Sequence, residues 1–126
     1  MKFLAPHTSL LRIVSGLLFL QHGTTKYLSL PVTAASGVSP ASMSGAAGLI
    51  ELVGGALLVI GLFTRPVAFV LSGTMAVGYF YAHFPKGFYP ILNGGELAAL
   101  YCFVFLYLAA AGGGDLSVDR LRNRRA

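Results

Sequence analysis

The fold class is decided by residues 46–84, which read AAGLIELVGGALLVIGLFTRPVAFVLSGTMAVGYFYAHF. Two long and mostly apolar runs, residues 46–63 and 67–84, are separated only by a short connection that ends in Pro66. So short a connection between two helices forces them to run antiparallel as a helical hairpin. The proline suits the first turn of the second helix, where its missing N–H removes no hydrogen bond.

Two further apolar segments flank this hairpin. One covers about residues 7–30 and is followed by residues 31–45, a Ser/Pro/Gly/Ala-rich stretch without charge that is typical of a loop. The other covers about residues 93–111 and ends at a run of glycines, which break helices. Because a spanning helix needs about 20 apolar residues, the four segments predict a single domain, residues 1–126, folded as an all-α membrane four-helix bundle.

The composition favours a protein embedded in a lipid bilayer. Of the 126 residues, 56% are hydrophobic and only 10% are charged, whereas soluble domains carry about 25% charged residues. The net charge of +5 comes mainly from arginines in the tail. Positive charge beside a span is typical of contact with lipid headgroups, so we expect the bilayer, and no nucleic acid, as a partner.

The first apolar segment admits a second interpretation, a cleaved signal peptide, since Lys2 precedes an apolar run. Polar residues continue into the second half of the segment, however, and the small residues that follow form no clear cleavage site. We therefore expect a retained helix.

The lysines and arginines of the connections predict the orientation. Lys2 and Arg12 lie near the start, Arg65 lies in the second connection, and four arginines lie in the tail. The first connection has no cation, and the third has only Lys86. The positive-inside rule therefore predicts that both termini are cytoplasmic. We expect the long side chain of Arg12 to reach the inner interface.

This topology gathers ionisable residues of all four segments near the outer face. His22 and Lys26 lie one helical turn apart, in the outer half of the first segment. Glu51 lies about two turns into the second segment, at 1.5 Å per residue. His83 ends the third segment and Glu96 opens the fourth. A charged side chain in lipid is costly unless it is paired or faces a cavity, so these residues are candidates for a functional site.

Two interpretations of this cluster remain open. Glu51 and Glu96 are the candidate catalytic residues, as proton carriers, because burial raises a carboxyl pKa and a nearby cation lowers it. Both carboxylates could instead be structural, paired with cations to fix the bundle. The candidate ligand-binding residues are His22, Lys26, His83, Asn93 and Tyr101.

Metal and thiol chemistry are less well supported by the sequence. The histidines show no spacing such as HxxxH or ExxH, so no metal site is predicted, although a haem- or metal-binding protein remains an alternative. Cys102 is the single cysteine. It excludes a disulfide within the chain and dithiol redox chemistry.

Over nearly its whole length the chain resembles the DoxX family of small four-helix bacterial membrane proteins. The resemblance rests on R..SGLLFLQHG..K from Arg12 to Lys26, GLIELVGGALLVIGLFTRPVA from Gly48 to Ala68, and NGGELAALYCFVFLYLAAAGGGDLSVD from Asn93 to Asp119. The resemblance implies an inner-membrane protein of a family linked in some members to quinone-dependent oxidation. One such member is a subunit of a thiosulfate:quinone oxidoreductase, and others are associated with thiol-linked defence against oxidative stress.

Together, the cluster and the resemblance favour a membrane subunit that binds quinone, or a similar amphipathic molecule, near the outer leaflet and supports a membrane oxidoreductase. Because no redox cofactor motif is present, a membrane or soluble partner would supply electrons, and whether the chain is itself an enzyme is left open. The main alternative is a non-catalytic subunit that stabilises a larger membrane complex, as a homo- or hetero-oligomer. A small transporter is less favoured, because four helices leave little room for alternating access.

Overall fold

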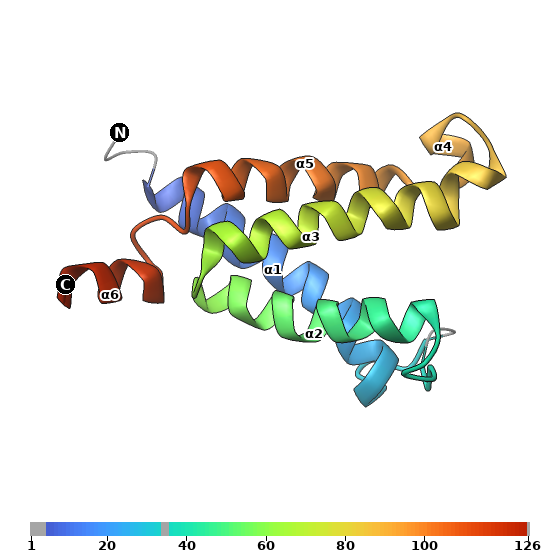
Figure 1. Cartoon of the computed structure of the whole chain (residues 1–126), viewed down its shortest axis with the longest axis horizontal. Coiled ribbons are helices and arrows are strands. Elements are labelled where there is room, and N and C mark those ends of the chain that lie inside the picture. Colours follow the sequence, from blue (N-terminus) through green and yellow to red (C-terminus); the bar gives the residue numbers. More distant parts are fainter. Residues whose placement is uncertain (1–4, 34–35, 126) are drawn as a thin grey trace.

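The computed structural model describes residues 5–33 and 36–125, and all regular structure within these residues is helical (Figure 1). The helices are α1 (Ala5–Leu28), α2 (Met43–Ile60), α3 (Thr64–Gly78), α4 (Pro90–Asn93), α5 (Glu96–Ala111) and α6 (Val118–Arg125). A π-helical turn, Tyr79–His83, and a 3-10 turn, Phe84–Lys86, continue α3. The predicted all-α fold class is confirmed. Lys2, which enters the predicted orientation, lies outside the described residues.

Local capping sets helix ends that hydropathy places only approximately. Helix α2 begins at Met43, before the predicted start at residue 46, because the hydroxyl of Ser42 accepts a hydrogen bond from the amide of Gly45 at 2.9 Å. Before α5 the chain makes the short helix α4, which ends at Gly94 in the left-handed conformation with φ 75°. Glycine adopts this conformation without steric cost, so the helix is broken there and restarts at Glu96.

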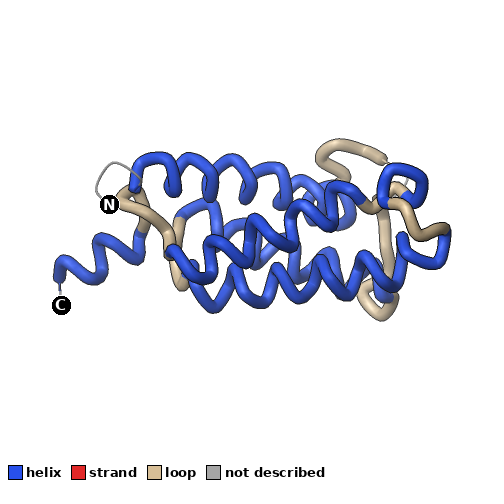
Figure 2. Tube along the Cα trace, turned by 90° about the horizontal axis from the view of Figure 1, so that it is seen from above, coloured by secondary structure: helices blue, strands red, loops and turns tan. Residues whose placement is uncertain are grey.

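Four long helices of the described chain pack as two pairs. Helix α1 lies against α2 and α3 lies against α5 over most of their length, whereas α2 and α3 touch less extensively. Helices α2, α3 and α5 run along a common direction, and α1 crosses them obliquely (Figure 1). Helix α6 projects from one end of the bundle (Figure 2). The first turns of α1 lie at this same end, and α4 lies at the opposite end (Figures 1 and 2).

Within the described residues, two helical stretches are long and apolar enough to cross a membrane. They are Met43–Ile60 and the continuous stretch Thr64–Lys86, and the apolar helix Glu96–Ala111 is shorter. Large apolar side chains such as Phe69 and Phe103 point outward, while the buried core is small and centred on Phe19, Leu58 and Phe105. An outer surface this apolar fits lipid surroundings.

Glycines allow the backbones of α1 and α2 to approach closely. A Cβ atom added at Gly23 would lie 2.7 Å from the amide nitrogen of Leu52, and one at Gly55 would lie 3.0 Å from Cα of Leu20. Side chains at these positions would therefore force the two helices apart. Gly73 on α3 differs, because an added Cβ there would meet no atom within 4 Å.

These two kinds of glycine respond differently to the same substitution. Gly23→Ala is expected to lower the free energy of unfolding by about 1–3 kcal/mol, because the methyl group overpacks a backbone contact. Gly73→Ala is expected to leave it unchanged or raise it by up to about 1 kcal/mol, because alanine favours helix. Thermal unfolding of both variants in detergent measures the difference, and equal effects would contradict the assigned α1–α2 packing.

Arg12 holds the chain that follows α5 onto α1. Its side chain is 1% exposed, and its guanidinium donates hydrogen bonds to the carbonyl of Gly113 and, at 2.6 Å, to that of Leu116. The expectation that Arg12 reaches the inner interface is therefore wrong. The side chain turns inward because the glycine-rich break after α5 leaves backbone carbonyls without helical partners, and a guanidinium satisfies several of them at once.

Asp119 on α6 caps the start of α3. Its carboxylate accepts hydrogen bonds from the amides of Phe63 at 2.7 Å and Thr64 at 2.8 Å, and its own amide donates to the carbonyl of Gly61 at 3.0 Å. Burial acts most strongly on the pKa of Asp119 and raises it. The amide and side chain of Thr64, the amide of Phe63 and the nearby Arg122 together outweigh burial and hold the pKa below the ordinary value of 3.8.

The lowered pKa makes the cap sensitive to acid. The stabilisation is present above the unfolded value of 3.8 and is lost as the pH falls through the lower folded pKa. Asp119→Ala is therefore expected to lower the free energy of unfolding by about 1–2 kcal/mol at neutral pH, with the difference from wild type shrinking below that value. Unfolding at several pH values measures this. Asp115→Ala is the control, because among the described residues its carboxylate accepts only a long contact of 3.4 Å from Ser9.

Candidate functional site

A cavity of about 620 Å³ lies between the four long helices, at the end of the bundle away from α6. We call it the polar cavity. Five of the seven predicted site residues line it, namely His22, Lys26, Glu51, His83 and Tyr101. They come from α1, α2, the π-helical turn and α5, so the structure brings together side chains that are far apart in the sequence.

Lys26 and Glu51 form an ion pair in the wall of this cavity. The Nζ atom of Lys26 lies 2.8 Å from Oε1 of Glu51, and the side chains are 13% and 7% exposed. Gly48 leaves room for the contact, because an added Cβ there would lie 3.0 Å from Cδ of Lys26 and 2.7 Å from the ring of Tyr27. The close packing of α1 on α2 thus positions the two charges.

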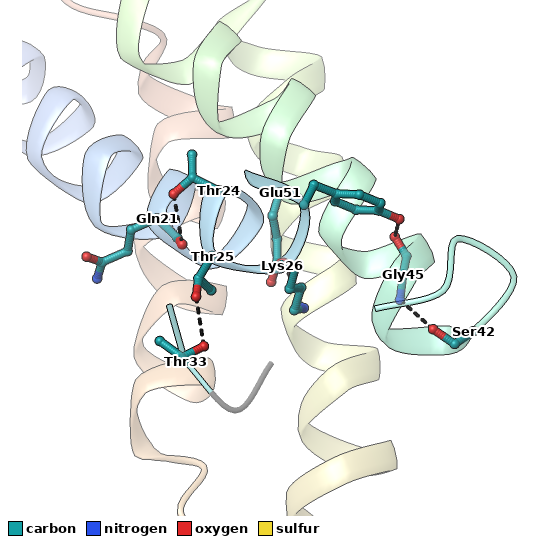
Figure 3. Close-up of polar contacts among 9 residues, drawn as sticks. Gln21, Thr24, Thr25, Lys26, Thr33, Ser42, Gly45 and Glu51 are labelled. Carbon is teal, nitrogen blue, oxygen red and sulfur yellow. Dashed lines mark hydrogen bonds and ion pairs between the residues drawn. The ribbon is translucent and has the colours of Figure 1, made fainter. Parts of the chain in front are cut away.

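Hydrogen bonds on either side hold this end of α1 in place. The hydroxyl of Tyr27 donates to the carbonyl of Gly45 at 2.6 Å, and the hydroxyls of Thr25 and Thr33 lie 2.7 Å apart. Figure 3 shows the ion pair where α1 and α2 face each other, between these contacts. The ion pair therefore lies in a part of the molecule that hydrogen bonds hold in place on both sides.

Tyr101 and His22 form the aromatic side of the cavity. The ring of Tyr101 stacks on Phe105, with centroids 5.4 Å apart and planes at 7°, and meets His22 edge-on at 6.5 Å. Phe19 packs against Tyr101 at 5.7 Å. Within the described residues neither the Tyr101 hydroxyl nor the His22 imidazole has a hydrogen-bond partner. Both groups are therefore available to a ligand.

His83 is held from outside the cavity by Asn93. Nδ1 of His83 lies 3.2 Å from the carbonyl oxygen of Asn93, which can only accept, so Nδ1 is the donor in this contact. The side chain of Asn93, 2% exposed, donates to the Tyr79 hydroxyl at 3.1 Å and the Gly87 carbonyl at 2.9 Å. Its oxygen accepts from the amide of Gly95 at 2.8 Å.

Two predicted site residues do not line the cavity. Asn93 supports the third connection through the contacts described above, and Glu96 is exposed in the first turn of α5, with no ion pair among the described residues. The ligand-binding role of Asn93 and the catalytic role of Glu96 remain predictions, as do the roles of the five residues in the cavity wall.

The cavity also has lining residues that the sequence did not single out as site residues. They include Thr74, Gly78 and Tyr81 on the face of α3 and its π-helical continuation. Their spacing of i, i+4 and i+7 is the signal that would have found them, because such positions share one helix face. Among the described residues no group of three or more His, Cys, Asp or Glu side chains is placed to hold a metal ion.

The family model named DoxX matches residues 7–84 of the chain. The chain belongs to the DoxX family. A Haemophilus influenzae protein described as uncharacterized is 48% identical over 114 residues, which cover 86% of this chain and 85% of the relative. The Bacillus subtilis protein named "Putative oxidoreductase CatD" is 30% identical over 115 residues, covering 89% of this chain and 84% of the relative. No solved structure matches the chain.

Family membership and the apolar helices together identify a DoxX membrane protein. The two membrane-length helical stretches lie at Met43–Ile60 and Thr64–Lys86. The first of them carries Glu51, and the second carries the α3 wall of the polar cavity. The polar cavity therefore lies between helices that fit a lipid environment, which is where an ionisable group calls for a function.

The ion pair gives this site a measurable energetic signature. Lys26→Met and Glu51→Leu are each expected to lower the free energy of unfolding by about 3 kcal/mol, because each leaves one buried charge without a partner. The double variant Lys26→Met/Glu51→Leu is expected to recover most of that loss, since no unpaired charge remains. A double-mutant cycle by thermal unfolding measures the coupling, and additive losses would show that the two side chains do not interact.

Proposed function

We propose that this DoxX protein crosses a bacterial inner membrane four times with both termini in the cytoplasm, and that its polar cavity binds the head of a quinone or a similar amphipathic molecule. In this role it supports a membrane oxidoreductase. The observation that carries the proposal is the pair of unpartnered polar groups, on His22 and Tyr101, beside a buried ion pair in one cavity.

The distribution of cations supports the proposed orientation. Arg65 lies at the start of α3, and Arg120 and Arg122 lie on α6, at the end of the bundle opposite the polar cavity. Cationic connections stay preferentially in the cytoplasm. The polar cavity then lies in the outer half of the bilayer, at the depth predicted from the sequence.

The chemistry of the cavity fits the head of a quinone. A quinone ring is flat and apolar and carries two carbonyl oxygens that accept hydrogen bonds. Phe19, Ile50 and Leu97 supply apolar wall, and Tyr101 and Lys26 can donate hydrogen bonds. Glu51 is the proposed proton carrier beside the ring, because it is the carboxylate in the cavity wall.

The electrons would come from another protein. The relative named "Putative oxidoreductase CatD" supports a redox setting, and the lone Cys102 cannot form a disulfide within the chain. We propose that a membrane or soluble redox partner donates or accepts electrons at the quinone. This chain binds and orients the quinone head and supplies or accepts its protons.

One observation favours a second candidate function, a non-catalytic subunit that stabilises a larger membrane complex. The Lys26–Glu51 ion pair joins α1 to α2 at 2.8 Å, and such a pair can act purely as a structural brace between helices. In that case the polar cavity has no ligand, and substitutions in its wall change only the yield of the complex.

A single tryptophan distinguishes the two functions, because the chain has none. Tyr81→Trp places the reporter in the cavity wall, and Phe103→Trp places the control on an exposed surface of α5 that does not line it. In nanodiscs, quinone is expected to quench the cavity tryptophan saturably and the control only in proportion to the quinone dissolved in the lipid. Identical, non-saturable quenching at both positions would rule out quinone binding in the cavity.

The same reporter tests the individual contacts. Tyr101→Phe in the Tyr81→Trp background removes one hydroxyl and is expected to weaken quinone binding about three- to tenfold, the loss of one hydrogen bond. Glu51→Gln should change the pH dependence of binding or turnover as well as its strength. If both variants bind quinone normally and only complex yield falls, the assembly function is correct.

A further inference from the structure

A second hollow runs along the seam between α2 and α3. It has a volume of about 440 Å³, and every residue that lines it is apolar. Its walls are formed on α2 mainly by Leu49, Val53 and Leu57, and on α3 by Val67 and Val70. We call it the apolar groove. The two helices are joined by a tight turn at one end and diverge toward the other (Figure 1).

The apolar groove continues the polar cavity. Ile50 lines both hollows, so they meet at this residue. Along α3 the groove residues run from Pro66 to Leu71 and the cavity residues begin at Gly73, which places the two hollows end to end in the same seam. At about 1.5 Å per residue, the groove extends about 12 Å along α2 from Leu49 to Leu57.

The α3 side of the polar cavity is kept open by glycines that make no packing contact. A Cβ added at Gly73 or Gly78 would meet no atom within 4 Å, although both line the cavity. At Gly54, deeper in the same seam, an added Cβ would lie 2.6 Å from Leu71. The contact between α2 and α3 is therefore closely packed at Gly54 and leaves open space toward the polar cavity, at Gly73 and Gly78.

We propose that the ligand is a long-tailed amphiphile, whose head occupies the polar cavity and whose hydrocarbon tail lies in the apolar groove. This inference rests on the proposed function and adds the class of ligand, a quinone with a long isoprenoid tail. The adjacency of the two hollows at Ile50 supports one molecule that occupies both. The absence of polar lining in the groove excludes hydrogen-bonding groups from the tail.

The groove selects the tail by shape. Lipid chains are as apolar as the groove, so a tail that leaves the lipid for the groove gains little from the hydrophobic effect. The gain comes from dispersion contacts with closely fitting walls and from the fixed direction that the tail gives to the head. A moderate preference for tailed over tail-less quinone follows from this balance.

Substitutions that fill the groove with larger side chains test the inference, in the Tyr81→Trp protein in nanodiscs. The probes are two naphthoquinones with the same ring, one with a methyl group and one with a long isoprenoid tail, and a matching pair of benzoquinones. Val53→Phe and Val70→Phe each add a ring to one wall of the groove, from positions that are more than half exposed. The control is Val14→Phe, on α1, which lines neither hollow.

The Tyr81→Trp protein is expected to bind the tailed probe of at least one ring class about tenfold more tightly than the tail-less probe, a difference of about 1.4 kcal/mol. Each groove variant in this background should abolish the preference for the tailed probe, whereas its tail-less binding and the Val14→Phe control should match the Tyr81→Trp protein.

If tail length does not matter in the Tyr81→Trp protein, the tail inference is wrong while the head site stands. If no probe binds, the proposed function fails with it. If the groove variants weaken both probes equally or change the oligomeric state, the groove holds a protein partner or shapes the fold, and the inference is overturned.

Discussion

The backbones of α1 and α2 are closest where glycines face the opposing helix, and this close approach constrains the rest of the site. Gly23 and Gly55 place one backbone directly against the other, and Gly48 leaves the space through which Lys26 reaches Glu51. Without a hydrophobic effect to press helices together in lipid, contacts of this kind supply much of the association. The ion pair is thus a consequence of small residues, since larger ones at these positions would separate the charges.

The polar groups discussed above differ in their hydrogen bonding between the two ends of the bundle. At the α6 end, Arg12 and Asp119 satisfy backbone carbonyls and amides that the helix ends and the glycine-rich break leave unpaired. At the other end, the polar groups of His22 and Tyr101 have no partner among the described residues, although Asn93 nearby is fully engaged. Among the described residues, the buried side-chain polar atoms that lack a partner are Nε of Arg12 and Oγ1 of Thr64, at the α6 end. The polar groups of His22 and Tyr101 instead open onto the polar cavity, so they can pair with a ligand there.

The sequence predicted the helices well because hydropathy and turn residues act locally. It also predicted that His22, Lys26, Glu51 and His83 would converge, since depth in a bundle follows from counting residues. The depth of a residue in the bundle does not show which way its side chain points, however. Helix α5 is apolar on nearly every side, so no periodic pattern showed that Glu96 would point outward.

Other contacts depend on breaks in the helices, which sequence patterns locate poorly. Arg12 turns inward because unpaired carbonyls follow α5. Asn93 had been expected to face a ligand as an amide near the outer face. Its engagement with Tyr79 and Gly87 comes from the short helix α4, which no apolar pattern indicated.

The structural and functional interpretations of the ion pair are compatible on energetic grounds. Two charges taken out of water are stabilised mainly by each other, so neither can be given up cheaply. A ligand whose oxygen accepts a hydrogen bond from Lys26 would replace part of what Glu51 supplies, so the charged ammonium would keep a hydrogen-bond partner when the carboxylate takes up a proton. A brace that joins α1 to α2 in the resting protein can therefore also be the group through which ligand binding and protonation are coupled.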